Sequence, residues 1–306
     1  MFWLKINMSP IAEVPSAEDL DSGVLGHVQI ATVWRRFARD RAALVGATII
    51  LFTFGIAVFA PSLSPADPLY QKAGDRLKFI GAVNHPLGTD TLGRDILSRL
   101  LYGSRTALRV AIIPVLFSAV FGLLFGLVAG YWGGFLDALI MRIADVMFAF
   151  PAVLLAIAIV AALGPSQFNA IFALTVVFIP AFARLVRSQV LGLREQDFVM
   201  AARAVGASDS RIIFHHIFIN TLPTCIVFAT LQTGQMIVFA AAFSFLGLGV
   251  QPPTPDWGAM ANDGRNCLLI APWVSTIPGL AIFAVSTGFN LLGDGLRDAL
   301  DPRLKI

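Results

Sequence analysis

The chain has 306 residues, of which 57% are hydrophobic and only 13% charged, and its formal net charge is +3. Soluble domains average about 25% charged residues, so this composition excludes a water-soluble globular protein. Excess Lys and Arg is typical of the cytoplasmic loops of membrane proteins, and we therefore expect a lipid bilayer, and no nucleic acid, as a partner.

The first predicted segment is residues 1–41, expected on the cytoplasmic side. Residues 33–44 (VWRRFARDRAAL) combine basic and apolar side chains, which predicts an amphipathic lead-in helix at the membrane surface. Because the segment lacks the apolar core of a signal peptide, no cleaved leader is expected.

Six apolar stretches follow within residues 42–292, and each is poor in charged residues, as transmembrane helices are. The predicted fold class is therefore an all-α membrane protein with six transmembrane helices. The predicted spans are about 42–60, 107–130, 137–163, 168–185, 223–250 and 273–292. Pro61 and Pro65 are expected to end the first span. Gly122, Gly126 and Gly130 recur every four residues in the second and predict close packing against another helix.

The distribution of basic residues predicts the orientation. With six spans, both termini lie on one side, and placing them in the cytoplasm puts fourteen of the 22 Lys and Arg residues there and eight outside. An extracytoplasmic region then covers about 62–106, a cytoplasmic segment about 186–222, an outer loop about 251–272, and a cytoplasmic tail 293–306.

The interiors of the spans carry almost no ionisable residues, and all four histidines fall outside them. The sequence therefore offers no catalytic residues, no cluster of metal ligands and no intramembrane proton relay. This disfavours two alternatives, a secondary transporter or channel and a membrane enzyme. The nucleotide-binding pattern G-x-x-x-x-G-K-[ST] is also missing, so any energy from ATP has to enter through a partner.

The polar stretch between spans four and five is the candidate entry point. Residues 195–206 (EQDFVMAARAVG) favour a helix, Gly206 can end it in a left-handed conformation, and Ser208 or Asp209 can cap a second helix. Such an exposed corner can dock a soluble partner; the alternative is a loop that only caps its own helices. The candidate coupling residues are Ala201, Ala202, Arg203, Gly206, Ala207, Ser208, Asp209 and Arg211.

The stretch AARAVGASDSRI (201–212) resembles the EAA loop of ABC importer permeases. Four further stretches resemble the second permease subunit of the dipeptide, oligopeptide and nickel importers: RRFARDRAALVG (35–46), HPLGTDTLGRDILSRLLYGSRTAL (85–108), FSFLGLGVQPPTPDWGAM (243–260) and GDGLRDALDPRL (293–304). Two positions depart from the family pattern: Met200 stands where the family has glutamate, and Ile219 where it has proline. Pro223 is expected to supply the helix break instead.

The resemblance implies a type I ABC importer permease fold in the bacterial inner membrane. It implies a heterodimer with a homologous permease, two ATPase subunits that hold ATP and magnesium, and an extracytoplasmic solute-binding protein, with no cofactor in this chain. The implied substrates are di- or oligopeptides, with nickel or another small solute as the alternative.

Two outer segments are candidate contacts for the binding protein or the substrate entrance. Residues 88–101 (GTDTLGRDILSRLL) predict a helix on the outer face in which Asp90, Arg94 and Asp95 pair locally, and a structural brace is the alternative role. Residues 250–258 (VQPPTPDWG) predict a stiff loop with Pro252, Pro253 and an interfacial Trp257, and an ordinary connector is the alternative. In the tail, Arg297 is expected at the cytoplasmic face, as an interfacial charge or an ATPase contact.

Overall fold

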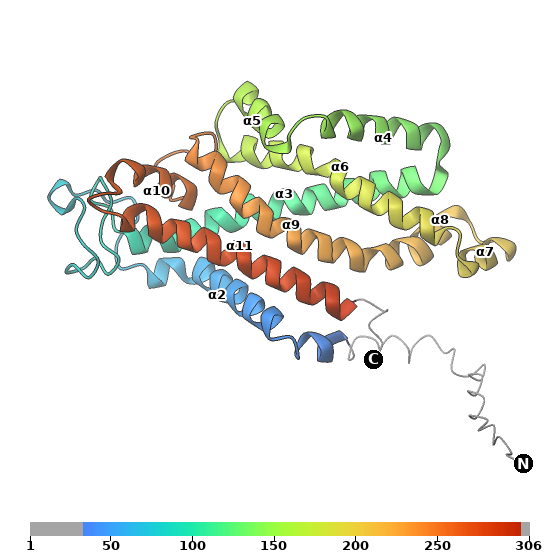
Figure 1. Ribbon diagram of the computed structural model, residues 1–306, viewed down its shortest axis with the longest axis horizontal. Helices are drawn as coiled ribbons and strands as arrows, with labels where there is room; N and C mark the ends of the chain where they lie inside the picture. Colours follow the sequence, from blue (N-terminus) through green and yellow to red (C-terminus); the bar gives the residue numbers. More distant parts are fainter. Residues whose placement is uncertain (1–32, 301–306) are drawn as a thin grey trace, which may run out of the picture.

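A computed structural model describes residues 33–300; the expectations for residues 1–32 and 301–306 lie outside this range. Long helices run side by side along one axis and form an elongated bundle (Figure 1). In chain order the elements are α2 (Arg41–Leu63), η2 (Ala73–Asp75), α3 (Ile96–Trp132), α4 (Gly134–Phe148), α5 (Ala152–Leu163), α6 (Gln167–Leu193), α7 (Asp197–Ala204), α8 (Asp209–Arg211), η3 (Ile212–Phe218), α9 (Ile219–Phe245), α10 (Trp257–Asp263), η4 (Arg265–Cys267) and α11 (Trp273–Leu300).

Five helices are long and apolar enough to cross a membrane, and α4 with α5 makes a sixth if the two are counted as one span. This confirms the all-helical membrane fold. The predicted continuous third span is wrong, because the chain bends by 89° between α4 and α5. Pro151 accounts for the bend, since it lacks an N–H group and disfavours helical backbone at Phe150.

The second span is part of a much longer helix. α3 begins at Ile96 and has 37 residues, so it is about 55 Å long and exceeds the ~30 Å hydrocarbon core of a bilayer. The prediction of a separate surface helix over residues 88–101 is therefore wrong. Asp95 caps α3, because its carboxylate accepts the Ser98 backbone N–H at 2.7 Å, and residues 88–95 form a loop before it.

Pro61 lies inside α2 and does not end it as predicted. A proline has no N–H group, so the Ala57 carbonyl loses its helical partner. The guanidinium of Arg105 on α3 fills this gap: Nε donates to the Ala57 oxygen, and Nη2 donates to the Val58 oxygen at 2.9 Å. The helix continues because a neighbour satisfies its freed backbone groups.

Other helices also pass the predicted span ends. α6 continues to Leu193, and α11 continues to Leu300 through most of the predicted polar tail. Pro223 lies inside α9, so it supplies no helix break. The segment directly before α9, η3, is π-helical, and this type of local adjustment accommodates helical prolines.

The lead-in helix is shorter than predicted. Residues 33–37 are helical, the chain turns at 38–40, and Asp40 then caps α2 by accepting the Ala42 N–H at 2.8 Å. Phe37 is buried with Ala43 and Ala299, which joins this segment to the start of α2 and the end of α11.

The bundle has two different ends (Figure 1). The start of α2, the end of α11, and α7 with α8 lie at one end, whereas α10 and the loop between α2 and α3 lie at the other. We call residues 197–218 the elbow, and these two ends the elbow end and the loop end. The chain has six candidate spans if α4 and α5 count as one. Because six is an even number, the start of α2 and the end of α11 lie at the same end of the bundle.

The predicted glycine stripe lies in the contact between α3 and α6. A Cβ atom at Gly126 would stand 2.6 Å from both the Ala183 carbonyl oxygen and the Val186 Cβ, and Gly122 and Gly130 face the same helix as closely. Ser118 adds a hydrogen bond from its hydroxyl to the Thr175 carbonyl oxygen at 2.8 Å. Small residues of this kind bring transmembrane helices together through van der Waals packing, since lipid supplies no hydrophobic drive.

We predict that Gly126→Ala destabilises the protein by about 1–3 kcal/mol, because the added methyl group overpacks a contact whose nearest atoms belong partly to the backbone. Gly55→Ala is the matched control, because Gly55 lies in α2 with no atom within 4 Å of the position that the added methyl group would take. Thermal unfolding in detergent measures both variants. Equal midpoints for the two would contradict the importance of this contact.

Candidate functional site

The elbow consists of two short helices joined by a glycine turn. α7 ends at Ala204, and Gly206 has φ +81, a left-handed conformation that side chains rarely adopt. The Gly206 N–H donates to the Arg203 oxygen at 2.9 Å, and the Ala207 N–H donates to the Ala202 oxygen at 3.0 Å. This pair of bonds is a Schellman motif, so the predicted helix, glycine corner and second helix are confirmed.

The second half of the elbow differs from the prediction in detail. Ser208 occupies the N-cap position of α8, but its side chain makes no capping hydrogen bond. Its hydroxyl lies 3.3 Å from the Ser210 hydroxyl instead. The chain then continues through the π-helical η3 directly into α9. The elbow is therefore continuous with a membrane-spanning helix.

Apolar side chains attach the elbow to the ends of α3 and α6. Val199, Ile212 and Ile217 are fully buried, and they share one hydrophobic cluster with Leu127 of α3 and Val190 of α6. Ala202 and Ala207 are half-buried and pack against the same cluster. The elbow therefore rests on the two helices that the glycine stripe joins.

A polar contact strengthens this attachment. The Tyr131 hydroxyl at the end of α3 donates to Asp209 Oδ1 at 2.5 Å, and the Arg203 guanidinium lies over the Tyr131 ring, 5.6 Å from its centre. Two of the predicted coupling residues, Arg203 and Asp209, thus hold the elbow in place. Sequence reasoning missed Tyr131, although it directly follows the last glycine of the stripe.

The outward face of the elbow is exposed in the part of the chain that the structure describes. Val205 at the tip is 85% exposed, and Met200 and Phe214 are also more than half exposed. Four more of the predicted residues are exposed as well: Ala201, Gly206, Ser208 and Arg211. Arg203 and Asp209 are exposed too, although both contact Tyr131. An apolar tip with flanking arginines, on a segment whose backbone is satisfied internally, is a surface that fits a protein partner.

At the loop end, most of the predicted contact residues are buried. Asp90, Arg94 and Asp95 are at most 5% exposed. Arg94 pairs with Asp90 at 2.5 Å and with Asp263 of α10 at 3.1 Å, which confirms local pairing for these two residues. Asp95 instead caps α3 and lies 3.0 Å from His85 Nδ1. The geometry of this cluster favours a structural brace, because the side chains of Asp90, Arg94 and Asp95 are covered by the protein itself. The Asp263 side chain is 41% exposed.

Trp257 is buried too, which contradicts its predicted place at the membrane interface. Its indole N–H donates to the Leu100 oxygen at 3.0 Å, and its ring covers Gly103 of α3. The predicted stiff outer loop contains the helix α10, which Asp256 caps by accepting the Ala259 N–H at 3.0 Å.

Burial raises the pKa of the Asp256 carboxyl group. Hydrogen bonds from Lys78 and Lys72 lower the pKa of Asp75 in the neighbouring loop to about 2.

Pro252 and Pro253 remain exposed, as a contact role requires. Pro253 and Pro255 line an open cavity of about 760 Å³ together with Pro61, Pro65 and Tyr102. The cavity is therefore a proline-rich hollow in the surface of the loop end. Within residues 33–300, no group of three or more His, Cys, Asp or Glu side chains could hold a metal ion.

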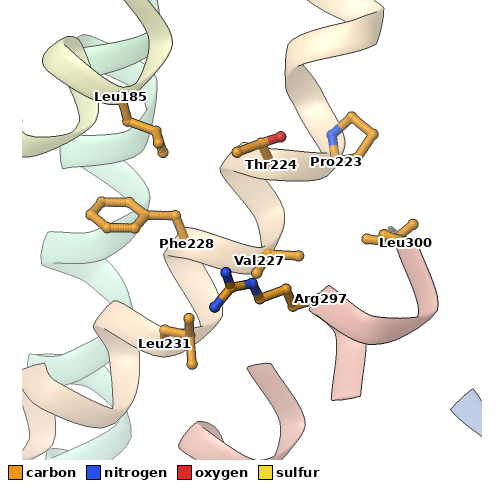
Figure 2. Close-up of a pocket in the computed structure, with 8 residues that line it drawn as sticks. All are labelled: Leu185, Pro223, Thr224, Val227, Phe228, Leu231, Arg297 and Leu300. Atoms are coloured by element: carbon orange, nitrogen blue, oxygen red, sulfur yellow. The ribbon is translucent and has the colours of Figure 1, made fainter. Parts of the chain in front are cut away.

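A second cavity, of about 410 Å³, lies between α9 and the end of α11 (Figure 2). Its walls are mostly apolar, and the Arg297 side chain extends from α11 toward α9. Arg297 is exposed at the elbow end, where the sequence placed an interfacial charge.

Comparison with known proteins identifies the family. Residues 122–306 match the family described as "Binding-protein-dependent transport system inner membrane component", and residues 29–82 match "N-terminal TM domain of oligopeptide transport permease C". The chain is 49% identical over 272 residues to proteins named "Glutathione transport system permease protein GsiD" from Escherichia coli O6:K15:H31, Shigella boydii serotype 4 and Shigella sonnei. The alignments cover 89% of this chain and 90% of each relative.

These matches agree with the resemblance of the EAA-like stretch and extend it over nearly the whole chain. A system of this kind combines permeases with an ATPase and a solute-binding protein, and its permease is not itself catalytic. The chain therefore belongs to the binding-protein-dependent permeases of ABC transporters, as an OppC-like multi-pass protein of the inner membrane.

Proposed function

We propose that this chain forms half of the translocation pathway of an importer for small peptides and that its elbow receives the movement of the ATPase subunits. One observation supports the coupling role: the tip of the elbow is exposed, whereas the side chains that attach the elbow to the bundle are buried. Val205 is 85% exposed, whereas Val199, Ile212 and Ile217 are fully buried against the bundle. A partner that moves the tip would therefore move α3 and α6 as well.

The proposal places the elbow end in the cytoplasm, with both chain termini on that side. The arginines around the start of α2 and on the elbow support this orientation, because basic residues gather on the cytoplasmic side. The loop end then faces outward, toward the solute-binding protein. There Pro252, Pro253 and the cavity beside Tyr102 offer exposed surface for that contact.

The second half of the pathway would come from a homologous permease, and two ATPase subunits would bind below, one on each elbow. The exposed apolar surfaces of α4 and α5, which include Ile143, Val146 and Leu154, are consistent with a further membrane subunit. The chain's own charges do not drive transport in this scheme. ATP and magnesium would be held by the ATPase subunits alone.

The substrate assignment rests on the named relatives. Proteins 49% identical to this chain are named as permeases of a glutathione transport system, and glutathione is a tripeptide. We therefore propose peptides of this size as the substrate class, with nickel or another small solute as the alternative outcome.

The coupling role predicts that Val205→Asp lowers substrate uptake at least tenfold. A carboxylate at the centre of the docking surface would lose its hydration without a partner, which costs several kcal/mol. The fold should be unaffected, because the side chain is exposed. Uptake, ATP hydrolysis and co-purification of the ATPase subunits measure the effect.

Val83→Asp is the matched control, since Val83 is 83% exposed but belongs to the loop between α2 and α3. It should keep the ATPase subunits bound. If Val205→Asp retains both ATPase binding and coupled uptake, the elbow is not the coupling element.

The attachment of the elbow predicts the effect of Tyr131→Phe. Losing the hydrogen bond to Asp209 should lower the free energy of opening the elbow by about 1 kcal/mol. The fraction of molecules with an open elbow should then rise roughly fivefold. Limited digestion with trypsin, which cleaves after arginine, should then cut faster at Arg203 and Arg211. Tyr102→Phe, at the loop end, serves as the control and should leave these rates unchanged. Equal cleavage in both variants would show that the Tyr131 hydroxyl does not hold the elbow.

The substrate proposal predicts ATP-dependent uptake of labelled glutathione into vesicles that contain the assembled transporter and its binding protein. Labelled dipeptide and nickel are measured in parallel. Uptake of nickel without uptake of either peptide would overturn the peptide assignment and leave the coupling proposal standing.

A further inference from the structure

We propose that the cavity between α9 and α11 binds an anionic phospholipid, with the lipid phosphate on Arg297 and an acyl chain along the apolar walls. The site lies beyond the transport function described above and does not depend on which peptide is carried. Figure 2 shows its parts: Leu185 of α6, five residues of α9, and Arg297 and Leu300 of α11.

The cavity lies next to a place where α9 and α11 approach each other closely. The Ser286 hydroxyl donates to the Gly234 oxygen at 2.8 Å, and Gly293 lies so close to Leu231 that a Cβ atom there would come within 2.6 Å of its side chain. Beyond this contact, residues of α9 between Pro223 and Leu231, together with Arg297 and Leu300 of α11, line a cavity of about 410 Å³. This space, which we call the wedge, lies on the elbow side of the contact.

Arg297 is a cation without a partner in the described chain. Across residues 33–300 its guanidinium forms no hydrogen bond or ion pair, although Asp294 lies one helical turn earlier on the same helix. By contrast, Arg184 and Arg187 of α6 both pair with carboxylates of α4. In Figure 2 the Arg297 side chain lies between α11 and α9, near Val227 and Leu231. It therefore presents its charge at an apolar wedge.

The apolar walls select an amphiphile over a soluble anion. Leu185, Val227, Phe228 and Leu231 would gain little from a free phosphate or carboxylate, which would leave them facing water. An acyl chain covers them, while the phosphate meets Arg297. Basic pockets between transmembrane helices bind lipid headgroups in this way.

The size of the cavity argues against a partner helix. An α-helix with side chains is about 10–12 Å across, so a volume of about 410 Å³ holds on the order of one turn. The location agrees with a lipid, because the end of α11 lies at the elbow end beside the start of α2 (Figure 1). Exposed Trp34, Arg35 and Arg39 precede α2 there, and such residues are typical of the headgroup layer.

The test measures lipid retention on the detergent-purified transporter. The complex is incubated with equimolar phosphatidylglycerol and phosphatidylethanolamine, and native mass spectrometry counts the lipids that stay bound. We expect preferential retention of phosphatidylglycerol. Arg297→Gln should lower it about fivefold, since one basic residue near a membrane surface contributes about 1 kcal/mol. Arg297→Lys should keep most of it.

Two further variants test whether the lipid binds in this cavity or only to surface charge in general. Val227→Trp fills the wedge without changing the charge and should lower retention of phosphatidylglycerol as well. Arg142→Gln removes an exposed arginine on α4, a helix that does not line the cavity, and should change nothing. An equal loss with Arg142→Gln, or full retention with Val227→Trp, would overturn the proposal.

A competition experiment with soluble anions tests whether the ligand is a lipid. Inorganic phosphate and glutathione at millimolar concentration are added as competitors and should leave the bound phosphatidylglycerol in place. Displacement by either would assign the cavity to a soluble anion and overturn the lipid assignment. Unchanged thermal unfolding of each variant confirms that a loss of lipid is not a loss of fold.

Discussion

The contact between α3 and α6 is the constraint on which the rest of the structure depends. At Gly122, Gly126 and Gly130 the missing side chains let the two backbones approach within van der Waals distance of each other's atoms. In lipid, this packing replaces the hydrophobic effect as the force that joins helices. Because Tyr131 and Val190 lie just past the stripe, the same contact builds the platform that carries the elbow.

The two ends of the bundle are held by different chemistry. At the elbow end, apolar residues and one phenol attach a segment whose tip stays free. At the loop end, the buried pair of Arg94 and Asp90 is joined to the partly exposed Asp263, which lies far away in the chain. A brace of this kind resists deformation, since separating one partner leaves a buried charge unpaired. The elbow end therefore presents a free surface, whereas the loop end is fixed by ion pairs.

The sequence predicted the features that depend on local chemistry. The apolar spans, the glycine stripe and the left-handed turn at Gly206 follow from residue type and spacing, and the structure contains them. The predictions that were wrong concern contacts between residues that lie far apart in the chain. Pro61 was expected to end a helix, but Arg105, on the next long helix, satisfies the freed Ala57 carbonyl. Trp257 was expected at the interface, but Gly103 makes room for its ring. Asp90 and Arg94 were expected at the surface, but both are buried, and Arg94 also pairs with Asp263 of α10.

The bend between α4 and α5 has a consequence for how this chain can exist in a membrane. Residues 149–151 interrupt the helical hydrogen bonds between α4 and α5, and all three are exposed in the described part of the chain. Hydrocarbon offers no hydrogen bonds to carbonyl groups released in this way, so non-helical backbone within the hydrocarbon has to meet protein or water. With α4 and α5 as one span, this corner therefore has to be sheltered by another chain or face an aqueous passage.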